Sequence, residues 1–309
     1  MTAPDHATPR LTLDLPPLPP RPPNMHKGQA GRVAIVAGSR GMSGAAVLCA
    51  QGVLRGGAGL VRVYCPASVQ PVIAASEPCL MTVGVGEDAE GRIAYGPAAQ
   101  KLNLEWANVL AIGPGLGQSL AMPEFVSYAV RHFRGPVVVD ADGLNNLATI
   151  AKVGDRLWKF RAGRDTVITP HPGELARLRA GAEMRPGDGP DDATRIALAC
   201  EYARYAGVTV VLKGHRTVVS TPTDAFVNTT GNPGMATGGM GDVLTGLIAA
   251  LLAQGMPGFD AARLAVHAHG LAADHCHREI GDVGYLARDV ADGLPAALTA
   301  ASRPRIGFV

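Results

Sequence analysis

The chain has 309 residues, of which 47% are hydrophobic and 17% charged, and its formal net charge at pH 7 is +2. This composition provides enough apolar residues for a large core, and the balanced charge without a long basic run makes nucleic acid a poor default partner. Its 39 glycines occur in short loops and not in a periodic repeat, which excludes a collagen-like or linker-like chain.

The first 24 residues contain eight prolines, and LPPLPPRPP is the densest stretch. Such a segment cannot form a helix and should pack poorly, so we expect residues 1–24 to be an extended tail. Residues 25–309 are then one folded domain. A ligand for a proline-binding module has the same pattern, but PxxP also occurs in many inert tails, and the plain tail is the preferred interpretation.

From Gly31 onward, short apolar strands alternate with helices. GRVAIVAG (31–38) is typical of a buried parallel strand, and a helix over 43–55 and a strand over 60–65 follow it. The remaining predicted elements are a strand at 108–112, a helix at 124–133, a strand ending at the acidic residues 140–142, a strand, turn and helix within 165–178, a helix near 191–206, a strand at 208–214, a hairpin within 215–230, and helices at 242–254, 260–280 and 286–301. We predict one doubly wound α/β domain, with a single mostly parallel sheet flanked by helices.

Unusual loops follow five of these strands directly. They are GSRGMSG (38–44), GPGLG (113–117), DADGLN (140–145), TPHPGE (169–174) and KGHRT (213–217). Ligands of open α/β sheets bind beyond the carboxyl ends of the strands. We therefore expect a ligand site along this edge of the sheet.

A glycine-rich segment with one acid precedes the helix at 242–254. Gly238, Gly239 and Gly241 allow backbone N–H groups to converge, and the helix N-terminus adds further N–H groups and its positive dipole end. No Lys-Ser/Thr pair follows, so this is not a Walker-type loop. Asp242 could be a helix cap. The open surroundings favour instead a general base acting beside a cradle for a transferring phosphoryl group.

Eight segments taken together resemble the ADP/ATP-dependent NAD(P)H-hydrate dehydratases of the ribokinase-like superfamily. The resemblance covers about residues 24–300. The segments are HKG (26–28), GSRGMSGAA (38–46), LRGGAGLV (54–61), GPGLG (113–117), VDADGLN (139–145), TPHPGE (169–174), LKGHRT (212–217) and NPGMATGGMGDVLTG (232–246).

The resemblance implies repair of hydrated NADH and NADPH. ADP or ATP would phosphorylate the C6 hydroxyl of the hydrate, and loss of phosphate, a better leaving group than hydroxide, would restore the dihydronicotinamide. Mg²⁺ is expected, because a transferring phosphoryl group needs its charge neutralised. The family also implies a homotetramer. Many bacterial members carry an N-terminal epimerase domain where this chain has the proline-rich tail, so a separate epimerase, or spontaneous epimerisation, is expected.

The resemblance also assigns roles by position. Asp242 would be the catalytic base, with Gly239 and Gly241 as the anion hole. The positions that match nucleotide contacts are Lys213, Gly214, His215, Arg216, Thr217 and Gly241. The positions that match substrate contacts are Ala45, Gly115, Gly117, His171 and Asp242. Glu174 falls where related kinases keep an acid that orders Mg²⁺.

Several of these residues have a simpler interpretation. His171 could cap the helix that carries Glu174. Asp140 and Asp142, two residues apart at a strand end, could be a metal pair; the alternative is that one caps the next helix and the other accepts hydrogen bonds from loop amides. We prefer this alternative for Asp142 and leave Asp140 open. Asn145 would only brace its loop.

A group of histidines near the C-terminus resembles a zinc cluster at first sight. It consists of His267, His269, His275 and His277 with Cys276. Zinc ligands on one helix lie three or four residues apart. These histidines do not have that spacing, so we expect packing and surface roles.

Three other functions remain as alternatives. A kinase of the same fold acting on a vitamin-type alcohol would share Asp242 but release a phosphoester. A nucleotide-binding regulator would have lost catalysis, although the acid is intact. A Rossmann dehydrogenase lacks its G-x-G-x-x-G pattern.

The five cysteines are odd in number, scattered and without a C-x-x-C pair, so we expect free thiols. The sequence has no signal-peptide pattern and no run of about 18 apolar residues. We therefore expect a cytoplasmic protein.

Overall fold

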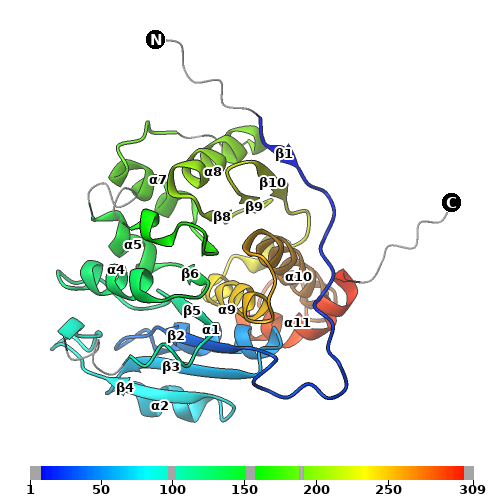
Figure 1. Ribbon diagram of the computed structural model, residues 1–309. Coiled ribbons are helices and arrows are strands. Elements are labelled where there is room, and N and C mark those ends of the chain that lie inside the picture. The colour runs from blue at the N-terminus through cyan, green and yellow to red at the C-terminus, as the bar shows by residue number, and fades with distance from the viewer. Residues whose placement is uncertain (1–7, 97–101, 151–156, 188, 190, 303–309) are drawn as a thin grey trace.

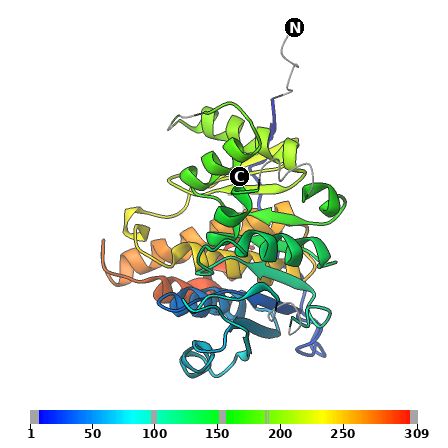
Figure 2. The ribbon, with the colours of Figure 1, turned by 90° about the vertical axis from the view of Figure 1, so that its left-hand side faces the viewer.

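The computed structural model describes residues 8–96, 102–150, 157–187, 189 and 191–302. Within these residues ten strands form one sheet in the order β1-β10-β9-β8-β7-β6-β5-β2-β3-β4. The strands are β1 Arg10–Leu11, β2 Arg32–Val36, β3 Leu60–Pro66, β4 Met81–Val85, β5 Val109–Ile112, β6 Val137–Val139, β7 Thr166–Ile168, β8 Thr209–Leu212, β9 Val218–Ser220 and β10 Asp224–Val227. Figures 1 and 2 show the sheet running from the β9–β10 hairpin near the top to β4 near the bottom.

The sheet is parallel from β8 through β4, and only β9 pairs antiparallel with its neighbours. Its central strands β5, β6, β7 and β8 are buried along their whole length, which explains their continuous apolar sequences. The predicted fold class, including the hairpin within 215–230, is confirmed. The strand β4 and a short helix between β3 and β4 were not predicted.

Helices cover both faces of the sheet (Figure 1). One face carries α1 Ser43–Arg55, α2 Gln70–Ser76, α9 Met240–Ala253, α10 Gly258–Glu279 and α11 Ala287–Ala301. The other carries α4 Met122–His132, α5 Asp142–Ala148, α7 Pro172–Gly181 and α8 Asp192–Ala206. Two short 3-10 turns, η1 Trp158–Arg161 and η2 Pro233–Met235, complete the described elements.

Local sequence signals account for several helix ends. Asp191 precedes helix α8 and caps it, since its side chain accepts a hydrogen bond from the Thr194 N–H, and the left-handed Gly207 follows the last helical residue. The helix at 43–55 has the predicted bounds. None of the helices in the described ranges combines the length and apolarity needed to cross a lipid bilayer.

The proline-rich segment is extended but does not pack loosely. In residues 8–24, which we call the strap, β1 pairs in parallel with the edge strand β10. Leu15 and Leu18 pack against the core, and Arg21 donates hydrogen bonds to the Gly57 carbonyl and the Gln254 side chain. Figure 1 shows the strap in blue along one side of the molecule. Residues 1–7 of the predicted tail and 303–309 of the predicted domain lie outside the described residues.

Candidate active site

The loops after the parallel strands meet at one edge of the sheet, as expected. The Gly38 N–H donates to the Pro114 carbonyl at 2.8 Å, and the Lys213 N–H donates to the Pro170 carbonyl at 2.8 Å. At Gly113, which has a φ of +132°, a Cβ would lie 1.8 Å from the Asp140 carbonyl oxygen. Each loop is therefore held directly by the loop of a neighbouring strand.

A largely buried ion pair lies at the centre of this edge. Lys213 Nζ is 2.6 Å from Asp140 Oδ1, and the Thr245 hydroxyl of α9 donates to Asp140 Oδ2 at 2.7 Å. Asp140 is 1% exposed, and a Glu174 oxygen lies 3.8 Å from Lys213 Nζ. Burial alone would lower the pKa of Lys213, but Asp140, Glu174 and Asp242 together raise it, so the lysine stays charged.

Asp140 and Asp142 point to different partners, which argues against a shared metal site. The residue between them, Ala141, has a φ of +50°, an uncommon backbone conformation for a side-chain-bearing residue. Beyond this turn, Asp142 Oδ2 accepts the Gly117 N–H at 2.9 Å and Oδ1 accepts from Asn145 Nδ2 at 3.3 Å. The preferred interpretation of Asp142 is confirmed. Asp140, which the sequence left open, anchors Lys213.

The glycine segment forms an open entrance to α9. Gly239 is the residue before the helix and has a φ of +91°, and a Cβ there would lie 2.4 Å from Leu48 Cδ1. A Cβ at Gly241 would lie 3.4 Å from Lys213 Nζ and 3.7 Å from Asp140 Oδ2, so Gly241 faces the ion pair. Around Gly238 there is open space. The N-terminal amides of α9 are therefore accessible to a ligand at the Lys213 side.

Asp242 is in the first turn of α9, but no side-chain hydrogen bond caps this helix. Burial, and then the neighbouring Asp140 carboxylate, raise the pKa of Asp242 to about 7, against the opposing effect of Lys213. A carboxylate with such a pKa takes up and releases a proton near neutral pH, which is the property that a general base needs. The structure thus gives no support to the cap, and the role of Asp242 as a base stays a prediction.

A cavity of about 670 Å³ opens beside this centre. Its lining includes all six residues predicted to bind nucleotide, namely Lys213, Gly214, His215, Arg216, Thr217 and Gly241. The opposite wall is the segment 230–236 together with residues of α10. The structure brings the predicted nucleotide residues together, and their contact with a nucleotide stays a prediction.

Arg195 of α8 holds residues 212–216 in place, and no sequence motif pointed to it. Its guanidinium donates to four backbone carbonyls: those of Leu212 (3.2 Å), Lys213 (3.4 Å), Arg216 (3.0 Å) and His215. Burial lowers the pKa of Arg195. One buried cation thus satisfies four carbonyl groups of an irregular loop, which a sequence motif cannot show.

Asn232 fixes the opposite wall through three hydrogen bonds. Its Oδ1 accepts from the Tyr285 hydroxyl at 2.6 Å and from the Gly234 N–H at 3.0 Å, and its Nδ2 donates to Asp274 Oδ1 at 3.0 Å. Asp274 Oδ2 also accepts the Gly231 N–H at 3.0 Å. The polar groups of this wall are therefore largely paired within the protein.

The histidines of α10 have separate environments. His269 is 5% exposed, lines the 670 Å³ cavity, and its Nε2 has no hydrogen-bond partner in the part of the chain that the structure describes. Burial lowers the pKa of His269 to about 4, so the ring is neutral. His275 and His277 are exposed on the same helix. The sequence interpretation as packing and surface residues did not anticipate that His269 lines a cavity.

Three of the predicted substrate positions lie together next to α1. Gly115 has a φ of +62°, and a Cβ there would lie 3.0 Å from the Ala45 Cβ. The Ser39 hydroxyl donates to the Gly115 carbonyl at 2.8 Å, and Gly117 is held by Asp142. The absence of side chains at these glycines allows the β5–α4 loop to lie close to the start of α1.

His171 lies apart from these glycines, at the start of α7. Its Nδ1 accepts the N–H groups of Gly173 and Glu174 at 3.0 and 3.3 Å, and Glu174 Oε2 accepts the His171 N–H at 2.7 Å. The capping role is confirmed, and because half of the His171 side chain is exposed, a substrate contact stays a prediction. Glu174 itself is buried beside Lys213.

Comparison with known proteins gives a consistent result. A family model described as NAD(P)H-hydrate dehydratase matches residues 33–296. The bifunctional NAD(P)H-hydrate repair enzyme Nnr of Moorella thermoacetica is 41% identical over 88% of this chain, and the chain spans 50% of that relative. The ADP-dependent (S)-NAD(P)H-hydrate dehydratase of Neisseria meningitidis is 38% identical over 88% of this chain and 85% of the relative.

A solved structure is similar over nearly its full length. It is the ADP/ATP-dependent NAD(P)H-hydrate dehydratase of Bacillus subtilis co-crystallised with ATP and Mg²⁺, with a TM-score of 0.73 and 29% identity, covering 92% of this chain and 95% of that one. The chain therefore spans about half the length of the bifunctional relatives and most of the length of the single-function ones.

Proposed function

This chain belongs to the NAD(P)H-hydrate dehydratase family, and we propose that it repairs hydrated NADH and NADPH by nucleotide-dependent dehydration. The observation that carries the proposal is the pairing of Asp242, a carboxylate with a pKa of about 7, with the glycine-lined N-terminus of α9 beside the 670 Å³ cavity. This pairing supplies a base and an anion hole at one place.

The proposed reaction has two stages. Asp242 accepts the proton of the C6 hydroxyl while the hydroxyl oxygen attacks the terminal phosphorus of ADP or ATP. AMP or ADP, respectively, is the leaving group. The backbone N–H groups at Gly239 and Gly241 hold the transferring phosphoryl group, and Lys213 adds a positive charge beside it. In the second stage the ring nitrogen lone pair expels phosphate from C6, and loss of a ring proton restores the dihydronicotinamide.

The charge balance of the site fits a divalent cation that arrives with the nucleotide. Asp140, Glu174 and Asp242 place three carboxyl groups around the single ammonium group of Lys213. No group of three or more His, Cys, Asp or Glu side chains within the described ranges could hold a metal by itself. We propose that Mg²⁺ is bound mainly by nucleotide phosphates, with Glu174 ordering it. Bound there, it would neutralise phosphoryl charge.

The proposed roles of the remaining residues follow their positions. Residues 213–217 would contact the nucleotide, and Ala45, Gly115, Gly117 and His171 the hydrate. A kinase that releases a phosphoester is not favoured, because the family model and the Neisseria relative are both described as dehydratases. A cytoplasmic location, a homotetramer and an epimerase supplied separately are further proposals that rest on the family resemblance.

The test measures absorbance at 340 nm after the protein is mixed with the S form of NADH hydrate, Mg²⁺ and either ADP or ATP. We expect a rise with at least one nucleotide and none with Asp242→Asn. Nucleotide consumption without a rise, and with a phosphorylated alcohol as the final product, would move the function to the kinase. No turnover of any kind would contradict both enzymes.

A further inference from the structure

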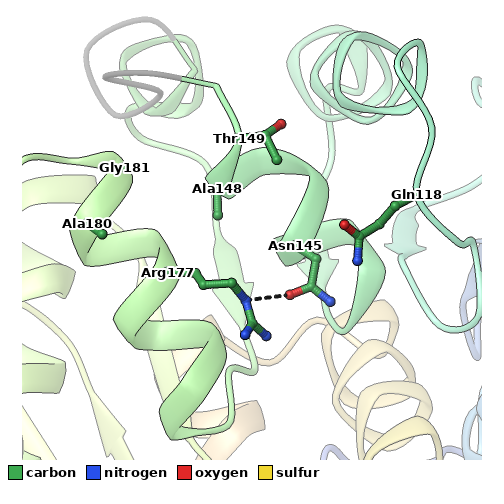
Figure 3. A pocket seen from close by; sticks show the side chains of 7 residues that line it. All are labelled: Gln118, Asn145, Ala148, Thr149, Arg177, Ala180 and Gly181. Atoms are coloured by element: carbon green, nitrogen blue, oxygen red, sulfur yellow. Dashed lines mark hydrogen bonds between the residues drawn. The ribbon is translucent and has the colours of Figure 1, made fainter.

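A second cavity, of about 440 Å³, lies between α5 and α7, away from the nucleotide cavity. Its lining residues are Gln118, Asn145, Ala148, Thr149, Arg177, Ala180 and Gly181. Figure 3 shows that α5 and α7 form two of its sides and that the side chains of Arg177, Asn145 and Gln118 point toward one another. None of these seven residues is among the positions that the sequence predicted to contact substrate or nucleotide.

Arg177 gives this cavity a positive charge. Its Nε donates to Asn145 Oδ1 at 3.1 Å, and the side chain is otherwise exposed. No carboxylate within the described residues lies at ion-pair distance from the guanidinium. The Nη groups therefore remain available to an anionic ligand, while the bond from Nε holds the planar fork in a defined orientation.

The same side chains lead to the loop proposed to hold the hydrate. Asn145 donates to Asp142 Oδ1 at 3.3 Å, and Asp142 Oδ2 accepts the Gly117 N–H at 2.9 Å. The cavity adjoins this loop, because Gln118, which lines the cavity, is the residue directly after Gly117. On the α7 side, the position of a Cβ at Gly173 would be 3.0 Å from His171 Cε1 and 3.8 Å from Arg177 Nη1. Arg177 thus lies near both predicted contacts of the hydrate, Gly117 and His171.

Small residues leave room in this cavity. Ala148, Ala180 and Gly181 present no long side chain, and a Cβ at Gly181 would lie 2.7 Å from the Ala148 carbonyl oxygen, which marks close packing of the two helices at that end. From Asp142 to Thr149 the helix rise amounts to about 10 Å. A dinucleotide held at the Gly117 loop is long enough to place a second group along this helix, whereas a small alcohol is not.

We propose that the cavity between α5 and α7 binds a phosphate of the distal half of the dinucleotide, with Arg177 as its main contact and the Asn145 and Gln118 amides beside it. The inference rests on the proposed function and extends it. Two phosphates could supply the same chemistry: the adenosine-side phosphate of the pyrophosphate bridge, present in both hydrates, and the 2′-phosphate, present only in the NADPH form.

The experiment compares Arg177→Ala and Arg177→Lys with the wild-type protein on three S hydrates: those of NADH, of NADPH and of nicotinamide mononucleotide, which lacks the distal half. We expect Arg177→Ala to raise the KM for the NADH hydrate by about 10- to 100-fold, as expected for loss of a charge-assisted contact. The KM for the mononucleotide hydrate, the KM for ADP or ATP and kcat should stay within about twofold. The KM of Arg177→Lys for the NADH hydrate should lie between those of the wild-type protein and Arg177→Ala. Arg131→Ala, which removes an exposed arginine on α4, is the matched control and should leave all values unchanged.

The outcomes separate the two proposals. If the wild-type protein dehydrates none of the three hydrates, the proposed function fails and the inference with it. If it does, an unchanged KM in Arg177→Ala, or an equal rise for the mononucleotide hydrate, overturns the inference alone, since an equal rise would mean that Arg177 only braces the Gly117 loop. An effect confined to the NADPH hydrate assigns the cavity to the 2′-phosphate. A thermal unfolding scan of each variant excludes loss of fold as the cause.

Discussion

The two halves of the proposed site are held in place in different ways. On the nucleotide side, buried or half-buried groups fix the loops: Arg195 satisfies four carbonyls of residues 212–216, and Asp274 and Tyr285 orient Asn232. On the hydrate side, a series of polar contacts runs from the exposed Arg177 through the half-buried Asn145 and Asp142 to Gly117. The first half is held by a buried arginine, and the second by a series of hydrogen bonds that begins at an exposed arginine.

This difference leads to a general expectation about variants. A buried hydrogen bond cannot be replaced by water, so breaking one on the nucleotide side should lower stability together with nucleotide affinity. The bond from Arg177 to Asn145 is exposed and is replaced by water at little cost, so changes at Arg177 should alter KM for the hydrate and leave the free energy of unfolding nearly unchanged. Asp242 belongs to both halves and should show the largest effect.

We expect Asp242→Asn to reduce kcat by roughly 10²- to 10⁴-fold, the range for loss of a general base. The same change should stabilise the fold at pH 8. The pKa of Asp242 in the folded protein, about 7, lies above that of an ordinary aspartate. The folded state therefore binds the proton more tightly than the unfolded state, and this contribution to stability is lost as the pH rises toward 7. Removing the charge should raise the free energy of unfolding by about 1–2 kcal/mol, measured by urea denaturation. A variant that is both inactive and less stable would contradict the assigned environment of Asp242.

The pH dependence of kcat/KM should show the same group. Asp242 acts as a base only when deprotonated, so the rate should fall about tenfold per pH unit below a pKa near 7 and level off above it. Lys213→Gln keeps a donor for Asp140 but removes the charge that lowers the pKa of Asp242, so the midpoint should move to higher pH. A profile that stays level down to pH 5 would assign the base to another group.

A matched pair of substitutions tests the comparison most directly. Asp274 and Asp142 each accept two hydrogen bonds, one from a backbone N–H and one from an asparagine amide. Asparagine offers only one acceptor oxygen, so each Asp→Asn change breaks one bond. We expect Asp274→Asn to raise the KM for nucleotide about tenfold, and Asp142→Asn to raise the KM for the hydrate by a similar factor. Equal effects of both variants on both constants would show that the halves are not independent.

The smallest effect is expected outside the site altogether. Arg10 of the strap forms an ion pair with Asp224 of β10, and the Arg10 side chain is 82% exposed. Arg10→Ala should change the free energy of unfolding by no more than about 0.5 kcal/mol and leave both KM values unchanged. A larger change, seen in denaturant titration or in steady-state kinetics, would show that the strap influences the site.

The fold and the location of the site could be predicted from the sequence, because both depend on local patterns. Alternating strands and helices and loops at strand ends are visible in a short window of residues, and so is the Gly-Gly-Met-Gly-Asp segment. The partners inside the site could not be predicted. Asp140 contacts Lys213, 73 residues away, and Thr245, 105 residues away. Arg195 lies on α8 and bonds to the loop that follows β8.

The same limit explains the two interpretations that the structure changed. The prolines of the strap exclude a helix, but they do not exclude an extended strand against β10, and the pairing depends on residues more than 200 positions away. His269 was grouped with its neighbours by spacing along the helix. Its surroundings depend instead on the segment 230–236, most of whose residues line the same cavity.

The strap also sets an order of events during synthesis of the chain. Its partner strand β10 begins 214 residues after Arg10. Gln254, which accepts a hydrogen bond from Arg21, comes 233 residues after Arg21. The strap therefore has no docking surface until more than 200 further residues have been made. A proline-rich sequence suits this waiting period, since it remains extended and resists premature helix or sheet formation. The strap is then one of the last parts to be seated, and its docking covers the edge of β10 that would otherwise be open to pairing with another chain.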